Sequence, residues 1–383
     1  MFCFSHLCRL ASLFGLMPWG ENMKVLITGG AGFIGSNAAS RFLRRGDEVV
    51  VIDNLAGHAS AVNLRWLRPQ GCLTFHHLDV RDAEAVTAVI REYSDADLVL
   101  HLASQVAVTS SIADPRLDFE VNALGTFNLL EAARLVGLRA PIIYASTNKV
   151  YGQLADLTLD DSNGRCDFMG LRYGISEERR LDFHSPYGCS KGAADQYVRD
   201  YHRIFGLNTV VMRQSCIYGP RQFGREDQGW LAWLMIAAEN RQPITIYGDG
   251  RQVRDILQIE DLLDAFEAAA RNIAIAAGSV YNVGGGPTNA VSLLEVLDFI
   301  EQRAGVRVPY DFAAPRPGDQ RVYISDIRRA CCQLGWSPRI AWRKGLGGLH
   351  DWIAANSAQL LLGSSAPRDC GTDFSLSSTS AQR

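Results

Sequence analysis

Three residues of this 383-residue chain, a threonine, a tyrosine and a lysine, could do chemistry together. Thr147 lies in the run STNKVYG, and Tyr187 and Lys191 lie four positions apart further along the chain. Four positions are about one helical turn, so these two side chains can face one cleft. A free tyrosine has a pKa near ~10, and a neighbouring ammonium favours the phenolate and lowers that pKa. The trio predicts a base that takes a proton from a hydroxyl while a nicotinamide takes the hydride.

A glycine-rich loop near the start of the chain predicts the place for that nicotinamide cofactor. The loop GGAGFIG follows an apolar run at 24–28, expected to be a buried strand, and opens a helix expected over 33–45, with Gly46 as its C-cap. Glycines let the backbone approach a pyrophosphate at the helix N-terminus. The cofactor-binding candidates in the loop are Gly29, Gly32, Phe33, Ile34 and Gly35.

An acidic residue extends this pattern. A second expected strand, 48–52, ends at Asp53, eighteen residues after Gly35, near the offset of an acid that binds the adenosine ribose. The alternative is a glycine turn with a solvated aspartate, which the strand–loop–helix–strand context disfavours. Asp53 would repel a 2′-phosphate, and the next residue, Asn54, is no arginine that could receive one. The expected cofactor is therefore NAD and not NADP.

The elements around these residues alternate between strand and helix, which predicts an α/β fold with a Rossmann-type, doubly wound parallel sheet. Strands are expected at 72–78, 97–102, 141–146 and 207–213, and helices at 82–93, at 118–136 and from Tyr187 to Phe205. Thr147 then lies at the carboxyl end of a strand, where open α/β sheets bind ligands. We expect an NAD-binding domain at 23–215, with an insertion at about 153–185. A smaller mixed α/β substrate domain would cover 216–355, with some segments returning to the sheet.

The bulk properties exclude several classes of protein. The net charge is −3 and 21% of residues are charged, with no basic stripe and no eighteen-residue apolar run, so neither nucleic acid nor a membrane is an expected partner. Nine scattered cysteines without C-x-x-C predict reduced thiols, a cytoplasmic protein and no metal site. Residues 1–22 are expected to be a disordered extension or a mis-assigned start, and 356–383 a disordered tail.

Together these motifs resemble the extended short-chain dehydrogenases/reductases, in particular the NAD-dependent nucleotide-sugar epimerases and dehydratases, over about residues 23–355. The supporting residues are the glycine loop, Asp53, Asp79, His101-Leu102-Ala103, Asn122, Thr147, Tyr187, Lys191, Arg213, Tyr218-Gly219-Pro220, Gly248–Asp255 and Arg316–Asp319. Longer runs, including STNKVYG, 182–197 and DQRV at 319–322, resemble the CDP-sugar 2-epimerases. The separation of forty positions from Thr147 to Tyr187 fits the insertion of that subgroup, although a surface loop without bearing on substrate is the alternative.

The resemblance implies a role for each site residue. Tyr187 is the acid/base, Lys191 lowers its pKa and binds the nicotinamide ribose, and Thr147 bonds the reacting hydroxyl. Further cofactor-binding residues are Asn54, Asp79, Val80, Leu102, Ala103 and Gln105. The substrate-binding candidates are Asn122, Thr147, Asn148, Gln214, Arg221, Gln228, Arg254 and Arg316. Arg254 and Arg316 would hold a diphosphate, while Arg221 fits a diphosphate contact and a surface ion pair equally well.

The predicted reaction is reversible inversion at C2 of a CDP-3,6-dideoxyhexose, in the synthesis of a surface polysaccharide such as an O-antigen. Dehydratases of this group place Asp-Glu after the threonine, and Asn148-Lys149 cannot supply that acid and base. A UDP-hexose 4-epimerase or a nucleotide-sugar reductase stays open as an alternative, and a non-catalytic NAD-binding protein is a remote one. We expect a homodimer or homotetramer, with Leu124, Phe127, Leu130 and Leu135 as candidate interface residues.

Overall fold

The structure of the chain is a computed structural model that describes residues 22–162, 164–305, 307–316, 318–357 and 360. The predictions made for residues 1–22 and 356–383 therefore lie almost wholly outside the described residues.

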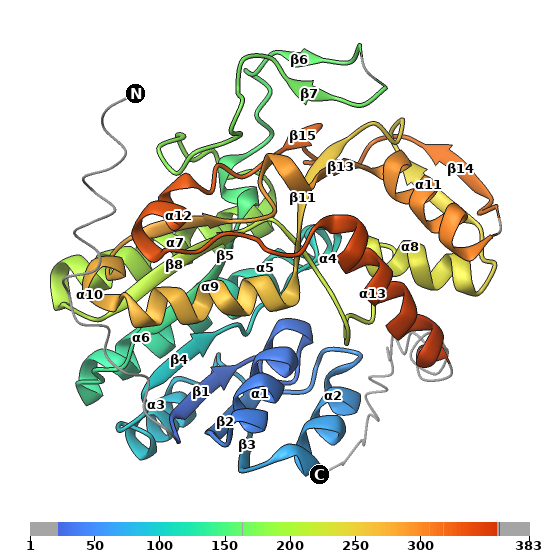
Figure 1. The fold of residues 1–383 in the computed structure, drawn as a ribbon. Helices are drawn as coiled ribbons and strands as arrows, with labels where there is room; N and C mark the ends of the chain where they lie inside the picture. Colours follow the sequence, from blue (N-terminus) through green and yellow to red (C-terminus); the bar gives the residue numbers. More distant parts are fainter. Residues whose placement is uncertain (1–21, 163, 306, 317, 358–359, 361–383) are drawn as a thin grey trace, which may run out of the picture.

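A seven-stranded parallel sheet forms the centre of the fold (Figure 1). Its strands are β1 (Lys24–Thr28), β2 (Glu48–Asp53), β3 (Leu73–His77), β4 (Leu98–His101), β5 (Ile142–Thr147), β8 (Thr209–Gln214) and β12 (Val280–Val283). They lie in the order β12-β8-β5-β4-β1-β2-β3. The chain steps outward from β1 to β3 and then returns to β4 beside β1, so the order reverses between these two strands. This is the switch point at which doubly wound sheets bind their ligands, and the predicted Rossmann-type fold is confirmed.

Helices cover both faces of this sheet. One face packs on α1 (Phe33–Arg45), α9 (Ile259–Arg271) and α12 (Arg328–Leu334). The other packs on α3 (Ala83–Glu92), α6 (Gly125–Val136) and α7 (Ser185–Phe205). Successive residues of each strand enter opposite cores: Val25 and Ile27 join the first, and Leu26 joins the second. Burial on both faces explains why the strands read as continuous apolar runs in the sequence.

The helical run before β5 differs from its prediction. It was expected over 118–136, but it begins as α5 (Pro115–Phe119), continues through a π-helical turn η2 (Glu120–Leu124) and ends as α6. The Asp114 side chain accepts from the Leu117 N–H and caps α5, and Pro115 occupies its first position. A cap and an N1 proline start a helix earlier than apolar periodicity alone indicates.

The chain after β8 builds a smaller unit beside the sheet and also returns to the sheet itself. β11 (Val253–Gln258) pairs with β9 (Cys216–Tyr218), β13 (Ala290–Ser292) and β15 (Val322–Tyr323), while β10 (Ile244–Tyr247) pairs with β14 (Tyr310–Ala313). Apolar residues of α8 (Trp230–Glu239), α11 (Leu293–Ala304) and α13 (Trp342–Ala355) form a separate core with these strands. A capping box formed by Ser292 and Glu295 opens α11. The remaining elements are α2 (Ser60–Leu67), η1 (Arg68–Gln70), α4 (Val108–Ala113), η3 (Asn148–Tyr151), α10 (Ile273–Ala276) and η4 (Pro287–Asn289).

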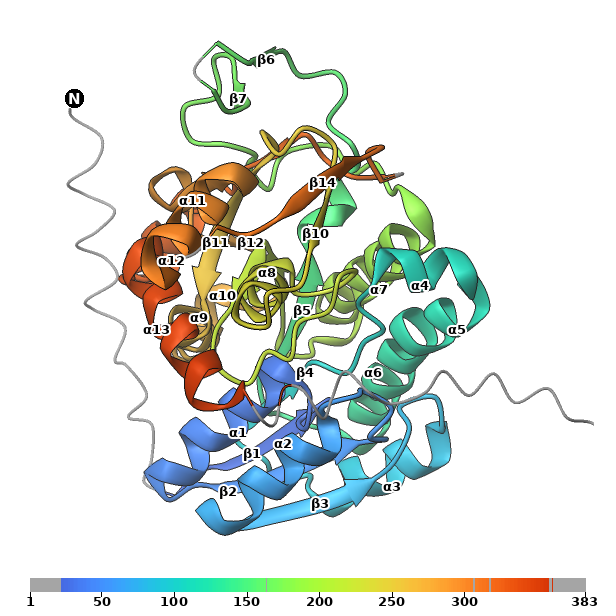
Figure 2. The same cartoon turned by 90° about the vertical axis from the view of Figure 1, so that its right-hand side faces the viewer.

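The segment between η3 and α7 projects as a hairpin of β6 (Leu159–Asp160) and β7 (Asp167–Phe168), drawn in green at the top of Figures 1 and 2. It contacts the smaller unit: the Cys166 N–H donates to the Arg251 carbonyl at 3.0 Å, and Ile175 bridges to Ser325. The segment therefore packs against residues that follow β8 in the chain.

Candidate active site

Gly29 and Gly35, in the loop between β1 and α1, leave no room for a side chain. A Cβ on Gly35 would lie 2.2 Å from the Gly29 carbonyl oxygen, and one on Gly29, whose φ is +68°, would lie 2.6 Å from the Ala103 nitrogen. No side chain caps the first turn of α1, whose N-cap is Gly32. A tight backbone cradle at an uncapped helix N-terminus fits a pyrophosphate, as the sequence predicts.

Asp53, at the end of β2, is bonded to this loop. One carboxylate oxygen accepts from the Ala31 N–H at 3.0 Å and the other from the Leu55 N–H at 2.8 Å. Burial raises the pKa of Asp53, and the two backbone bonds oppose that rise. The Asp53 carboxylate therefore stabilises the glycine loop. Its contact with the adenosine ribose stays a prediction.

Asp79 lies beside Asn54 at the adenosine end of the predicted site. Its carboxylate accepts from the Asn54 amide at 2.8 Å and from the Arg81 guanidinium at 2.9 Å. The hydrogen bond from Arg81 is the main reason that the pKa of Asp79 falls to about 2. Asp79 is thus a carboxylate at neutral pH with Arg81 as its counter-ion, and its predicted contact with the adenine amine stays a prediction.

The loop after β4 is held in place by a chain of buried polar groups. The Leu102 and Ala103 N–H groups each donate to the Thr28 hydroxyl oxygen at 3.2 Å, and that hydroxyl lies 2.7 Å from His101 Nδ1. Burial lowers the pKa of His101 to about 3, so the ring is neutral at pH 7. Its other nitrogen lies 2.9 Å from the Thr126 hydroxyl. This bracing fixes the backbone that was predicted to line the nicotinamide.

The structure brings Thr147, Tyr187 and Lys191 together. Thr147 ends β5, the other two lie in the first turns of α7, and all three are less than a tenth exposed. Burial raises the pKa of Tyr187 to about 12, against a hydrogen-bonding contact with Thr147 that lowers it. The Lys191 ammonium donates to the Ala145 carbonyl at 2.6 Å and lies 4.4 Å from the centre of the Tyr144 ring.

The electrostatics of this trio differ from the expectation that Lys191 lowers the pKa of Tyr187. Burial lowers the pKa of Lys191 itself to about 7, despite the nearby carboxylates of Asp195 and Asp118. A lysine that is half neutral at pH 7 exerts little pull on a phenol. Desolvation outweighs the charge effect that the sequence suggests, because both groups lie deep in the fold.

We expect Lys191 to make the stability of the NAD-free protein rise with pH. The pKa of Lys191 is about 7 in the fold, and that of a lysine in an unfolded chain is near ~10.4. Between these values the unfolded state binds more protons, so the free energy of unfolding increases with pH by up to ~1.4 kcal/mol per unit. K191M should remove this increment, which urea unfolding of both stripped proteins at several pH values measures. Equal slopes in the two proteins would contradict burial as a neutral amine.

Asp118 and Ser190, which the sequence analysis did not single out, join α5 to α7. The buried carboxylate of Asp118 accepts from the Ser190 hydroxyl at 2.5 Å and from the Asn122 amide at 3.1 Å. Asn122 also donates to the Gln105 carbonyl at 3.1 Å, and its amide oxygen accepts from the Gln105 N–H at 2.9 Å. These bonds make Asn122 a brace between the Gln105 loop and the catalytic helix. Its predicted contact with substrate stays untested.

A buried ion pair holds α7 against the sheet. Arg213 on β8 donates two bonds of 2.9 Å to Asp195, which also accepts from the Ser146 hydroxyl at 2.8 Å. The remaining guanidinium nitrogen donates to the Tyr151 hydroxyl at 3.1 Å. Arg213 is among the residues that support the resemblance, but no role was assigned to it. Its partner, Asp195, lies eighteen residues away, and nothing in the sequence indicates that the two residues pair. The structure assigns Arg213 to positioning the strand and helix that carry the trio.

Several predicted substrate residues gather beside Thr147. Gln214 is the partner of Thr147 across β5 and β8, and the buried Gln214 side-chain nitrogen has no hydrogen-bond partner among the described residues. The Asn148 amide donates to the Gln320 side chain at 3.2 Å. Arg254 donates to Asp319 at 2.7 Å, and Lys149, which follows Asn148, lies 3.3 Å from the same oxygen. An unsatisfied amide and a cation pair sharing one carboxylate form a polar wall suited to an anionic, hydroxylated ligand.

The other three predicted substrate residues lie elsewhere. The Arg316 guanidinium stacks 3.9 Å from the centre of the Tyr247 ring and donates to the Glu226 carbonyl at 3.1 Å. Gln228 forms a backbone bridge with Arg225. Arg221 is buried, and its Nε donates to Asn63 of α2 at 2.9 Å. The structure therefore does not bring Arg221 together with Arg254, because its side chain turns toward the helix that follows β2.

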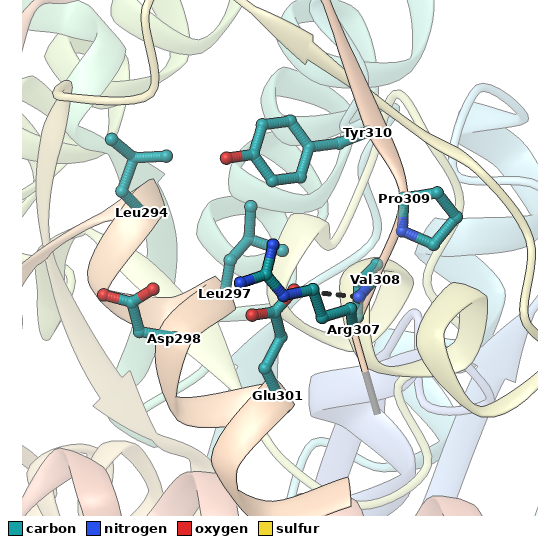
Figure 3. Close-up of a pocket in the computed structure, with 8 residues that line it drawn as sticks. All are labelled: Leu294, Leu297, Asp298, Glu301, Arg307, Val308, Pro309 and Tyr310. Atoms are coloured by element: carbon teal, nitrogen blue, oxygen red, sulfur yellow. Dashed lines mark hydrogen bonds between the residues drawn. The ribbon is translucent and has the colours of Figure 1, made fainter. Parts of the chain in front are cut away.

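Figure 3 shows an open pocket of 520 Å³ in the smaller unit. The residues that line it come from α11 and the segment leading into β14, and they are Leu294, Leu297, Asp298, Glu301, Arg307, Val308, Pro309 and Tyr310. None of them is among the predicted site residues, so this pocket does not belong to the predicted active site.

The fold and the trio define an extended short-chain dehydrogenase/reductase. Residues 26–347 match the family described as GDP-mannose 4,6 dehydratase, and the chain belongs to that family. It is 44% identical to CDP-paratose 2-epimerase of Salmonella typhi, over 87% of this chain and 100% of the relative. Among solved structures, UDP-glucuronic acid 4-epimerase of Bacillus cereus with UDP-glucuronic acid and NAD has a TM-score of 0.76 and 29% identity. UDP-glucose 4-epimerase of Thermus thermophilus with NAD has a TM-score of 0.73 and 33% identity. Each alignment covers 87% of this chain and 99% of the solved chain.

Proposed function

We propose that the protein is an NAD-dependent isomerase that interconverts CDP-paratose and CDP-tyvelose by inverting C2 of the sugar. The observation that carries this proposal is the assembled trio beside a cradle that fits a dinucleotide. The 44% identity to a CDP-paratose 2-epimerase over the full length of that relative supports the particular sugar. Synthesis of a surface polysaccharide such as an O-antigen, in the cytoplasm, fits such a substrate. No helix within the described residues is long and apolar enough to cross a membrane.

The residues of the chain would divide the work as follows. Tyr187 takes the proton of the C2 hydroxyl, which Thr147 orients, and returns it after inversion. Lys191 lies one turn along α7 and can bind the ribose next to the reacting carbon. When bound, NAD supplies the hydride acceptor and a cationic ring. An opposite charge near Tyr187 favours the phenolate and offsets the effect of burial on its pKa.

The neighbours of Thr147 favour epimerisation over dehydration. Asn148 bonds Gln320, and Lys149 shares Asp319 with Arg254, so the two positions after Thr147 carry an amide and a cation. Neither group can act as the extra acid and base that eliminating water requires. Because the hydride returns to the same carbon, the reaction has no net redox change and NAD should stay bound through the cycle.

An NMR time course of the purified protein with CDP-paratose and no added NAD tests the proposal. Appearance of CDP-tyvelose would show both C2 epimerisation and a retained cofactor. If the sugar stays unchanged while denatured protein releases NAD, the same assay with UDP-glucose would test the 4-epimerase alternative. Stoichiometric consumption of a reduced cofactor would indicate a reductase.

Homo-oligomerisation through the continuous helical run η2–α6 and through α7 is part of this proposal. Leu124 and Leu135 are 39% and 64% exposed, and Tyr197 and Ile204 on α7 are 48% and 66% exposed. A run of large apolar side chains on two adjacent helices marks an interaction surface. Leu130, by contrast, is fully buried in the core, because its side chain points from α6 to the sheet, so its expected place at an interface is wrong.

We expect the double variant L124K/Y197K to be monomeric. Placing a lysine on each of the two helices puts like charges across a two-fold interface and removes apolar area. Light scattering after gel filtration should show a dimer or tetramer for the parent protein and half that mass or less for the variant. The control is R343M on α13, whose oligomer should have the same mass as that of the parent protein. A variant with the parent's mass would place the interface elsewhere.

A further inference from the structure

Arg221 stands out because it is a buried cation without a carboxylate partner. Its residue is 5% exposed, and burial alone lowers the pKa of its guanidinium to about 10. Among the described residues, no acidic oxygen lies within ion-pairing distance of it. Its φ of +68° is a conformation that costs free energy for residues other than glycine. A strained backbone and an unpaired buried charge persist only where the surrounding structure holds them, and they often mark function.

The contacts of Arg221 lead to the glycine loop in two steps. Its Nε donates to the Asn63 side-chain oxygen at 2.9 Å, and the guanidinium lies 4.5 Å from the centre of the Trp66 ring. The Asn63 side-chain nitrogen donates to the Ala31 carbonyl at 3.1 Å. Ala31 is the turn residue whose N–H is already held by Asp53. Asn63 thus fixes one side of the phosphate cradle, and Arg221 fixes Asn63.

The residue before Arg221 holds the other side of the cradle. The Pro220 carbonyl accepts from the Asn37 amide at 3.0 Å, and the same amide nitrogen donates to the Phe33 carbonyl in the first turn of α1. Helices α1 and α2 lie side by side in Figures 1 and 2. The segment after β9, where the chain leaves toward the smaller unit, is therefore bonded to both helices that flank the glycine loop.

We propose that Arg221 is a positioning residue that keeps NAD bound, acting through Asn63 on Ala31. This inference rests on the proposed function, since an epimerase must retain its cofactor through a cycle in which the hydride leaves and returns. The relay joins the first residues beyond β9 to the turn that holds the pyrophosphate, so the cradle cannot relax while Arg221 is in place. The uncompensated charge also favours a dianionic group nearby, because no carboxylate cancels it.

The experiment measures release of NAD from the purified holoprotein after dilution into an enzymatic trap that reports free NAD. R221M and N63A should each accelerate release at least about tenfold, the loss expected for one hydrogen bond to a charged group. R343M is the matched control, because Arg343 also stacks on a tryptophan, Trp342 at 4.3 Å, but lies on α13 without a link to the loop. It should release NAD at the parent rate.

Two further variants test whether Arg221 acts through Asn63 or through a general loss of packing or charge. The double variant R221M/N63A should release NAD no faster than the faster single variant, because both changes cut one chain of contacts. R221K keeps the charge and loses the Nε bond, so it should release NAD nearly as fast as R221M. The proposal would be overturned if R221M or R221K released NAD at the parent rate. It would also be overturned if the release rate of the double variant rose by the product of the two single effects.

The variants distinguish a loss of folding from a loss of NAD retention. R221K keeps the aliphatic stem packed on Trp66, so its rate of NAD release can be measured even if R221M does not fold. If the parent protein carries no NAD after purification and does not bind added NAD, the proposed function fails. If the parent retains NAD and the relay variants do as well, only the role of Arg221 fails.

Discussion

Replacing Tyr187 with phenylalanine should lower kcat by about a thousandfold, the usual size of a general acid–base contribution. The substitution removes one oxygen atom from a buried ring, so packing in the first turn of α7 is kept. The cradle lies on other elements, and the purified variant should therefore contain as much NAD as the parent protein. Turnover is followed by NMR with CDP-paratose, and NAD is measured after denaturation.

The imidazole and carboxyl groups described around the trio are already engaged in hydrogen bonds. His101 is neutral and bonded on both ring nitrogens, and Asp118 is bonded to Ser190 and Asn122. Two buried amines remain as candidates: Lys191, whose pKa is about 7, and Lys149, whose pKa burial also lowers. Any activity left in Y187F should therefore follow the titration of a lysine, with a pH profile unlike that of the parent.

The matched control is Y197F on the same helix. Tyr197 is half exposed and lies ten residues beyond Tyr187, so loss of its hydroxyl should leave kcat unchanged. Near-normal turnover in Y187F would show that the role of Tyr187 is wrong. Equal losses in both variants would point to disturbance of α7 and not to proton transfer.

Local signals explain why the cofactor side of the fold could be predicted from the sequence. Helix α1 has the predicted bounds Phe33–Arg45, because a glycine turn starts it and Gly46, with a φ of +92°, ends it. The apolar runs that became β1 and β2 needed no long-range information, since strands covered on both faces are apolar throughout. The spacing from Tyr187 to Lys191 likewise determines which two side chains share a helix face.

The polar contacts that position the trio could not be predicted, because they join distant segments. Asp118 meets Ser190 across 72 residues, and Asn122 meets the same serine across 68. Sequence pattern shows the type of each residue but not its partner. Arg221 illustrates the difficulty: an arginine reaches far enough to serve a substrate, an ion pair or a neighbouring helix, and only the fold shows that it bonds Asn63.

Replacing Gly35 with alanine should abolish tight binding of NAD. The added Cβ would lie 2.2 Å from the Gly29 carbonyl oxygen and 2.7 Å from Gly30 Cα, both backbone atoms of the cradle. Neither atom belongs to a flexible side chain, so the turn itself must move, and overpacking of this kind costs roughly 1–3 kcal/mol of stability. A shifted turn also withdraws the backbone from the pyrophosphate. Purified G35A should therefore contain little NAD, which absorbance of the denatured protein measures.

The control for this variant is G348A on α13. Nothing lies within 4 Å of a Cβ at Gly348, and its φ is not positive. Alanine in an unstrained helix restricts the unfolded chain, so G348A should raise stability by about 0.4–1 kcal/mol and leave the NAD content unchanged. The melting temperature of each variant should be compared with that of parent protein stripped of NAD. If G35A matches the stripped parent in stability but rebinds NAD as tightly as the parent, the close approach of Gly35 to Gly29 is not what shapes the cradle.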